Sequence, residues 1–175
     1  MPYRKPIKEV PLPAEYYWPE FPVNEEAEKT ILGAIMLDNA FFAEANKLTP
    51  EDFSLDSNRR IFLRMSQLMD GRGSVDIVTL SNEMARHKDG GGREIQTVGG
   101  VAYLASLTEG LPRRPVIREY IAIVKEKAFL RRIIGVCEQA TSKANEQHDT
   151  AAQIVKWMGE NLKGIKEQPC KPAKN

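Results

Sequence analysis

The sequence predicts an all-α protein with a compact multi-helix head followed by a long antiparallel helical hairpin. Apolar residues recur at spacings of three and four through most of the chain, which is typical of amphipathic helices. No stretch shows a convincing period-two alternation, the pattern of half-buried strands. Residues 116–147 contain no proline, and a helix of about 30 residues would be roughly 45 Å long.

The first 22 residues are expected to form an extended arm before the first helix. They hold six prolines, and proline is excluded from helix interiors. A helix is expected after Asn24, because asparagine is a favourable N-cap. Glu25, Glu26 and Glu28 follow the cap, and we interpret them as partners of the positive helix start rather than as a catalytic acid/base pair.

Short helices are expected to build the head, residues 23–112. One is predicted over residues 40–45, a helical turn after Thr49, and further helices after Asp56 or Ser57 and after the N-cap Asp76. The apolar residues expected to face the core of the head are Ala27, Ile31, Ala34, Ile35, Ile61, Phe62, Met65, Leu68, Met69, Ile77, Leu80, Met84, Val101, Leu104 and Leu107.

Glycines divide the second half of the head. Residues 88–96 include three consecutive glycines and are expected to form a loop. Residues 98–107 are expected to form the last helix of the head.

The hairpin is expected over residues 113–166. A helix over residues 116–147 is followed by a turn and by Asp149, a predicted N-cap for the second helix. On a helical wheel, the apolar residues of the first and second halves of the long helix lie on roughly opposite sides. We therefore expect its buried face to change near Ala128, where the helix leaves the head.

The outer half of the hairpin carries more apolar surface than one partner helix covers. Its apolar arc spans about 160° at 100° per residue, and Trp157 falls outside the main stripe of the second helix. Such surface on a projecting element usually marks a protein contact, so we expect self-association through paired hairpins. The alternative is a hairpin folded back over the head. The residues expected at the contact are Leu130, Ile134, Cys137, Val155, Trp157, Met158, Leu162 and Ile165.

Composition excludes several classes of protein. Lysine and arginine number 25 against 24 acidic residues, a net charge of +1, so no global signal for nucleic acid is present. No run of 18 apolar residues and no apolar leader occur, so no membrane association is expected. Cys137 and Cys170 are expected to be reduced thiols in a cytoplasmic protein.

No catalytic residues, cofactor site or metal site are expected in this chain. The glycine clusters at residues 90–92 and 98–100 lack the Gly-Lys-Ser/Thr sequence of a phosphate loop. His87 and His148 have no neighbouring metal ligands in the sequence.

Two pairs of arginines are candidates for contact with nucleic acid. A solvated face, or ion pairs with Glu119 or Glu126, is favoured instead, because no aromatic residues for base stacking are interleaved with them. The four candidates are Arg113, Arg114, Arg131 and Arg132.

Six segments occur in a characteristic order: residues 26–38 (EAEKTILGAIMLD), 52–53 (DF), 59–62 (RRIF), 73–80 (GSVDIVTL), 98–107 (VGGVAYLASL) and 120–134 (YIAIVKEKAFLRRII). This series resembles the amino-terminal domain of bacterial replicative hexameric helicases, the DnaB family. The resemblance covers roughly residues 21–165. In this chain Asn58 stands where the family commonly has a histidine, and the proline-rich arm is longer than usual.

The resemblance implies a non-catalytic collar in which hairpins pair and dimers assemble as a trimer around DNA. It also implies binding of primase and, in some bacteria, of a helicase loader. ATP and Mg²⁺ are expected only in the family's motor domain, which this chain lacks. Residues 167–175 are expected to be a disordered tail or the start of the linker to that motor. The alternative is a free-standing regulator that mimics the collar and binds helicase or primase.

Overall fold

The computed structural model describes residues 21–71, 73–90, 92–112 and 115–166. Helix α1 (Glu25–Leu37) packs against both α3 (Asp56–Asp70) and α7 (Ile117–Glu146). The carboxamide oxygen of Asn24 accepts a hydrogen bond from the Ala27 amide at 2.9 Å, which confirms the predicted N-cap. Almost the whole circumference of α1 is buried, so this helix forms the centre of the head.

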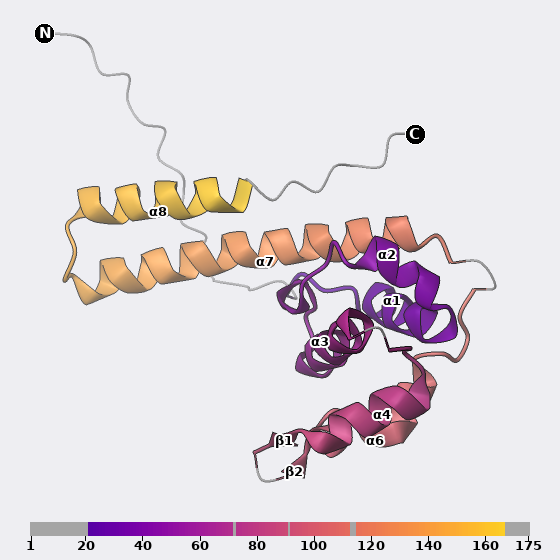
Figure 1. The fold of residues 1–175 in the computed structure, drawn as a ribbon. Coiled ribbons are helices and arrows are strands. Elements are labelled where there is room, and N and C mark those ends of the chain that lie inside the picture. Colours follow the sequence, from indigo (N-terminus) through magenta and orange to yellow (C-terminus); the bar gives the residue numbers. More distant parts are fainter. Residues whose placement is uncertain (1–20, 72, 91, 113–114, 167–175) are drawn as a thin grey trace, which may run out of the picture.

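The predicted helices follow in the expected order, with additional short elements in residues 88–97 (Figure 1). Asp76 caps α4 by accepting hydrogen bonds from the amides of Val78 and Thr79, both at 2.8 Å. In chain order the elements are η1 (Asn39–Phe41), α2 (Phe42–Ala45), η2 (Pro50–Asp52), α3 (Asp56–Asp70), α4 (Ile77–Arg86), β1 (Lys88–Asp89), β2 (Gly92–Arg93), α5 (Glu94–Thr97), α6 (Gly100–Ser106), α7 (Ile117–Glu146) and α8 (Ala151–Lys166).

A single core joins α1, α3, α4, α6 and the first half of α7. The ring centroids of Phe53 and Phe62, both fully buried in this core, lie 4.9 Å apart. Most of the apolar residues predicted to face inward are buried or half-buried. Val101 is the exception, since it is exposed on the first turn of α6, while Val98, just before this helix, is buried.

The predicted loop over residues 88–96 contains regular structure instead. Strands β1 and β2 pair antiparallel, with Lys88 opposite Arg93 and Asp89 opposite Gly92, and α5 follows directly. Gly90 has a φ of 56°, a left-handed conformation that tight turns require and glycine adopts at little cost. Strands of two residues are too short to produce a readable alternation, which is why the sequence did not predict them.

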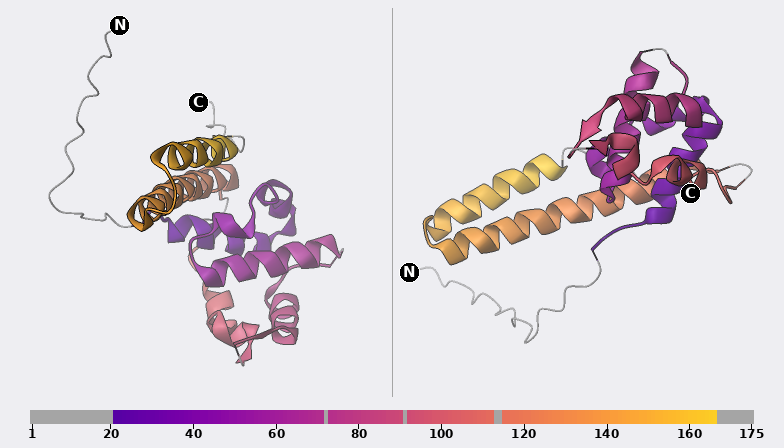
Figure 2. Two further views of the ribbon diagram at one scale, coloured as in Figure 1. Left: turned by 90° about the vertical axis from the view of Figure 1, so that its left-hand side faces the viewer. Right: turned by 90° about the horizontal axis from the view of Figure 1, so that it is seen from below.

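Helix α7 changes its buried face along its length, as predicted. In its first half Ile117, Ile121, Val124 and Ala128 are buried, and this half packs on α1, α2 and η2. In its second half Val136 and Ala140 are buried instead, and α8 packs on this half. The change follows Arg131 rather than Ala128, and the predicted side is only partly buried, because Leu130, Cys137 and Ala144 are exposed. The hairpin projects from the head rather than folding over it, and α7 lies between the head and α8 (Figures 1 and 2).

The predicted N-cap of α8 is wrong by one residue. The Thr150 hydroxyl accepts a hydrogen bond from the Gln153 amide at 3.4 Å, and the Gln153 side chain accepts one from the Thr150 amide at 2.7 Å. This reciprocal pairing satisfies two helix-start amides, so Thr150 is the better cap. Asp149 instead forms an ion pair with Lys143 at 3.1 Å.

Most of the predicted arm, residues 1–22, and the predicted tail, residues 167–175, lie outside the described residues. Within the described part of the chain, no helix has the length and apolar character needed to cross a membrane. In the same part, no group of three or more His, Cys, Asp or Glu side chains is placed to hold a metal ion.

Candidate interaction surface of the helical hairpin

The inner face of α8 is rotated relative to the predicted stripe. Trp157, predicted to fall outside that stripe, is half-buried, and its ring centroid lies 5.6 Å from the Lys143 amino group on α7. Val155, predicted within the stripe, is 68% exposed. Turning the largest side chain of α8 toward α7 buries more apolar area than turning Val155 would, which accounts for the rotation.

The eight residues predicted at the hairpin contact divide into two groups. Leu130, Cys137 and Val155 are exposed, with exposed fractions of 36% for Leu130 and 68% for Val155. The five others are half-buried: Ile134, Trp157, Met158, Leu162 and Ile165.

The exposed and half-buried apolar residues Leu130, Ile134 and Cys137 of α7 form a narrow strip. At 100° per residue, Leu130, Ile134 and Cys137 fall within about 60° of one another. Ile123 continues this strip toward the head and is itself 36% exposed. The resulting spacings of seven, four and three residues match the seam of a coiled coil.

Helix α8 adds Val155 and Leu162 to the same side of the hairpin. These two residues are seven apart, and they lie on the flank of α8 next to its inner face. Because α7 and α8 run antiparallel, this flank and the α7 strip fall on one side of the plane through both helix axes. The hairpin therefore carries a one-sided apolar surface, which we call the hairpin strip: Ile123, Leu130, Ile134, Cys137, Val155 and Leu162.

Arg131 and Arg132 connect the hairpin to the head. Arg131 is buried, and its guanidinium donates hydrogen bonds to the carbonyl oxygens of Pro22 at 2.8 Å and Asp52 at 2.6 Å. Burial lowers the pKa of Arg131. Arg132 forms an ion pair with the Asp52 carboxylate.

These contacts correct the expectation for the second arginine pair. The acidic partner of Arg132 is Asp52 rather than Glu119 or Glu126, because η2 packs on α7 and the two glutamates lie on exposed positions of α7. The guanidinium of Arg131 donates its hydrogen bonds to the main-chain carbonyl groups of Pro22 and Asp52. Because these donors are already used inside the protein, we assign Arg131 a structural role rather than contact with nucleic acid. Arg113 and Arg114 lie outside the described residues.

Glu28 also has a role that differs from the predicted one. It is buried, and its carboxylate accepts hydrogen bonds from the Ser54 amide at 2.6 Å and from the Asn58 side chain at 2.8 Å. The Asn58 carbonyl in turn accepts a hydrogen bond from the Tyr103 hydroxyl at 2.8 Å. Glu28 lies three residues before Ile31 on the buried face of α1, a position that could have indicated its burial.

Comparison with known proteins places the chain in a family. The model of the family described as DnaB-like helicase N terminal domain matches residues 20–126. The replicative DNA helicase DnaB of Geobacillus stearothermophilus is 34% identical over 147 residues, which cover 83% of this chain and 31% of that protein. The replicative DNA helicase DnaC of Bacillus subtilis is 33% identical over the same length, with the same coverage. The chain thus spans about a third of these relatives' length.

Solved structures show the same fold. The N-terminal domain of DnaB helicase from Mycobacterium tuberculosis superposes with a TM-score of 0.73 at 24% identity, covering 82% of this chain and 99% of that one. A DnaB-like replicative helicase, described together with its interactions with primase, gives a TM-score of 0.64 at 23% identity, covering 81% of this chain and 31% of that one. The family match over residues 20–126 and the curated relatives show that this chain belongs to the DnaB-like helicase N-terminal domain family.

Proposed function

We propose that this chain is the non-catalytic collar domain of a replicative helicase and that it associates with itself through the hairpin strip. The observation that carries this proposal is the one-sided apolar surface on a hairpin that projects away from the head. Burying an exposed Val, Leu or Ile side chain contributes about 1.5–3 kcal/mol. A second hairpin packed along the strip would bury several such side chains at once.

The spacing of the strip favours a second hairpin as its partner. Leu130, Ile134 and Cys137 repeat at the coiled-coil interval, so an identical helix offers a complementary row of apolar side chains. A two-fold pairing places the same strip on both copies. In the complete helicase, three such dimers would close into the collar around DNA.

The junction at Arg131 supports a collar of fixed shape. Its guanidinium donates hydrogen bonds to the carbonyl oxygen of Pro22, which precedes α1 in the sequence, and to that of Asp52, at the end of η2. A hairpin fastened in this way keeps a constant direction relative to its head. Paired hairpins would therefore hold two heads at a fixed separation, as a ring requires.

Primase and a helicase loader are the proposed partners of the assembled collar. The structural neighbour described with its interactions with primase supports the first of these partners. Binding and hydrolysis of ATP with Mg²⁺ would reside in the motor domain of the complete helicase, and the protein would act in the cytoplasm.

A matched pair of substitutions tests the proposal. Val155→Glu places a charge on the hairpin strip, and Val78→Glu places the same charge on the head, where Val78 is 62% exposed. Because both valines are exposed, neither change should unfold a single copy. Sedimentation velocity should show loss of the dimer for Val155→Glu alone. Equal sedimentation of both variants and the parent would contradict the proposal.

A further inference from the structure

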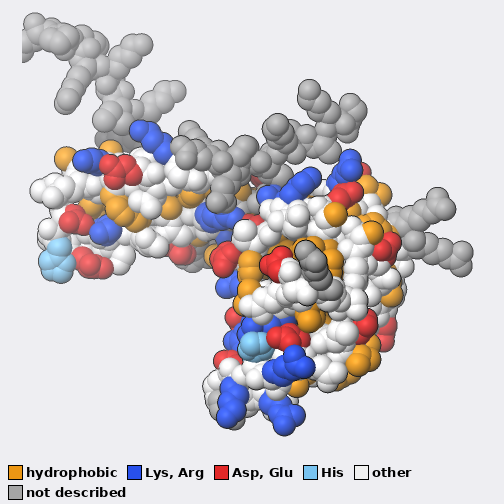
Figure 3. Space-filling model, viewed as in Figure 1, with side chains coloured by type: hydrophobic (Ala, Val, Ile, Leu, Met, Phe, Trp, Pro, Cys, Tyr) orange, Lys and Arg blue, Asp and Glu red, His pale blue; other side chains and the backbone are white. Residues whose placement is uncertain are grey.

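The β1–β2 turn presents a cluster of basic side chains at one end of the head. Lys88 and Arg93 are exposed, and neither has a side-chain partner among the described residues. Arg86, at the end of α4, has a side chain that is 76% exposed and forms an ion pair with Glu83 at 3.2 Å. Figure 3 shows lysine and arginine side chains gathered at this end of the head, where Figure 1 draws the two strands. We call Arg86, Lys88 and Arg93 the basic turn.

Two of these cations are placed against each other by the strand register. Lys88 and Arg93 are direct cross-strand partners in an antiparallel sheet with only two residue pairs. Like charges at directly opposite positions destabilise a strand pair, and a two-stranded hairpin is only marginally stable by itself. The arrangement costs stability in isolation, and an anion bound between the two side chains would remove that cost.

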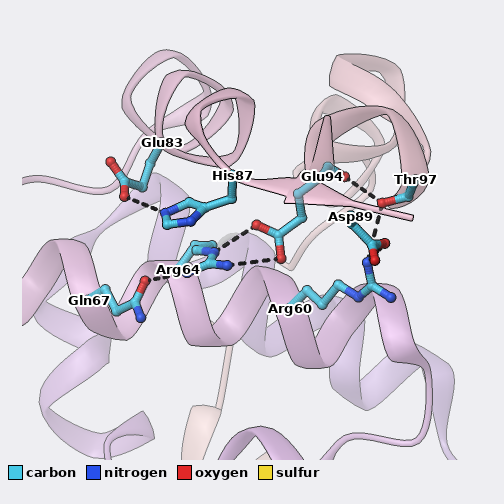
Figure 4. A network of polar contacts seen from close by, with 8 residues as sticks. All are labelled: Arg60, Arg64, Gln67, Glu83, His87, Asp89, Glu94 and Thr97. Carbon is cyan, nitrogen blue, oxygen red and sulfur yellow. Dashed lines mark hydrogen bonds and ion pairs between the residues drawn. The ribbon is translucent and has the colours of Figure 1, made fainter. Parts of the chain in front are cut away.

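The acidic side chains nearby already have partners (Figure 4). Glu83 lies 3.2 Å from the Arg86 guanidinium and 3.0 Å from the His87 ring, whereas Asp89 and Glu94 pair with arginines of α3. Arg60 forms an ion pair with Asp89, and Arg64 forms one with Glu94 at 2.7 Å. The hydrogen bond from Arg60 lowers the pKa of Asp89, so this carboxylate remains ionised and directed at α3. The pairing leaves Lys88 and Arg93 as uncompensated positive charge on a chain whose net charge is only +1.

We propose that the basic turn binds the phosphate backbone of nucleic acid. Ammonium and guanidinium groups are the usual donors to phosphate oxygens. Residues 86–94 contain no Phe, Tyr or Trp side chain for base stacking, and the His87 ring lies 3.0 Å from the Glu83 carboxylate. Recognition is therefore limited to the backbone and is independent of sequence. Gly90 and Gly92 add no side chain between the cations, so a phosphate can approach the turn closely. The proposal does not depend on pairing of the hairpins.

The expected binding is weak and strongly dependent on salt. Two phosphate contacts, from Lys88 and Arg93, lower log K by roughly 1.4 for each tenfold rise in salt on a single strand. The signal is therefore largest at low ionic strength. Fluorescence anisotropy of a labelled thymidine oligonucleotide, and of the same strand in a duplex, measures it directly.

Charge-matched double variants separate the basic turn from general electrostatics. Lys88→Glu/Arg93→Glu and Lys47→Glu/Lys163→Glu change the net charge by the same amount, and Lys47 and Lys163 are exposed elsewhere on the surface. The first variant should lose at least tenfold in affinity for both oligonucleotides, and the second should retain the parent affinity. Equal losses, or no binding by the parent at low salt, would overturn the proposal.

Two further measurements keep the result interpretable. Lys88→Gln, which removes one of the opposed charges without adding another, should also weaken binding while its melting temperature at low salt stays the same or rises. A weaker affinity of Lys88→Gln at an unchanged melting temperature cannot be caused by unfolding of the protein. Poly-glutamate that competes as well as an oligonucleotide of equal charge would show an acidic-peptide site instead. Val155→Glu, which tests self-association through the hairpin strip, should bind DNA like the parent. The result for the basic turn therefore does not depend on whether the hairpins pair.

Discussion

The Nη2 atom of Arg131 lies 2.6 Å from the carbonyl oxygen of Asp52, joining the middle of α7 to the end of η2 across 79 residues of sequence. The second guanidinium nitrogen, Nη1, binds the carbonyl oxygen of Pro22. A charged donor that satisfies two main-chain acceptors is worth more than a neutral one. The contact lies where α7 leaves the head, so it adds to the packing of the first half of α7 on α1, α2 and η2.

Replacing Arg131 with methionine should destabilise the whole chain. The substitution keeps much of the side-chain volume but removes both hydrogen bonds, and each bond to a charged group contributes about 1.5–3 kcal/mol. Urea unfolding should show a free energy of unfolding lower by at least this amount. Arg86→Met is the control, because it removes only a solvent-exposed ion pair with Glu83, and such pairs contribute little to stability. Equal losses in the two variants would argue against a structural role for Arg131.

Asn58 is the central member of a buried polar chain from Glu28 to Tyr103. Asn58→Ala removes a donor from the Glu28 carboxylate and an acceptor from the Tyr103 hydroxyl. A buried polar group left unsatisfied costs about 1–3 kcal/mol, and the loss should appear in the free energy of unfolding. Asn58→His restores a donor and should lose less stability. A histidine variant as unstable as the alanine variant would contradict this reading of the network.

Asp76 should make α4 sensitive to acid. Hydrogen bonds from the Thr79 and Val78 amides lower the pKa of Asp76, that from Thr79 most strongly. A lowered folded-state pKa gives stability that is complete above the ordinary aspartate pKa of about 3.9 and is lost as the pH falls through the folded value. Asp76→Ala should therefore cost about 1 kcal/mol at neutral pH.

The difference between the parent and Asp76→Ala should shrink as the pH falls below the ordinary aspartate range. Thermal unfolding across an acid series measures it. Asp76→Asn, which caps without a charge, should keep most of the stability at neutral pH and lose the acid dependence. A parent–alanine difference that stays constant through the acid range would show that the ionised carboxylate contributes nothing.

Trp157 should stabilise the hairpin rather than the head. Its contact with the Lys143 amino group is of a kind that contributes about 0.5–1 kcal/mol at exposed sites, and its ring also covers part of α7. Trp157→Ala should speed hydrogen exchange of the α8 amides while those of α1 stay protected. Val155→Ala should leave both unchanged in the dissociated protein. Faster exchange throughout the head would contradict a local role.

The features predicted best from the sequence are those fixed by neighbouring residues. Asn24 and Asp76 cap their helices as expected, because a cap requires only a side chain and the amides that follow it. The change of face in α7 could be predicted from its apolar pattern alone. Self-association through the hairpin remains a prediction, with a surface that the structure now defines.

The features that were missed depend on residues far apart in the sequence. The burial of Glu28 depends on donors from Ser54 and Asn58, which lie 26 and 30 residues away. The rotation of α8 depends on how Trp157 fits against α7. Lys88 and Arg93 lie opposite each other only in the observed strand register. Strands of two residues carry too little sequence pattern for this register to be predicted.

The mass of the unmodified chain in solution, measured by light scattering against concentration, tests the central claim most directly. Exposed apolar surface on the hairpin strip predicts a mass that rises from 19.7 kDa toward twice that value with concentration. Val155→Glu should hold the mass at the lower value throughout. An unmodified chain that stays at 19.7 kDa at every concentration would contradict the assignment of the hairpin as a pairing element.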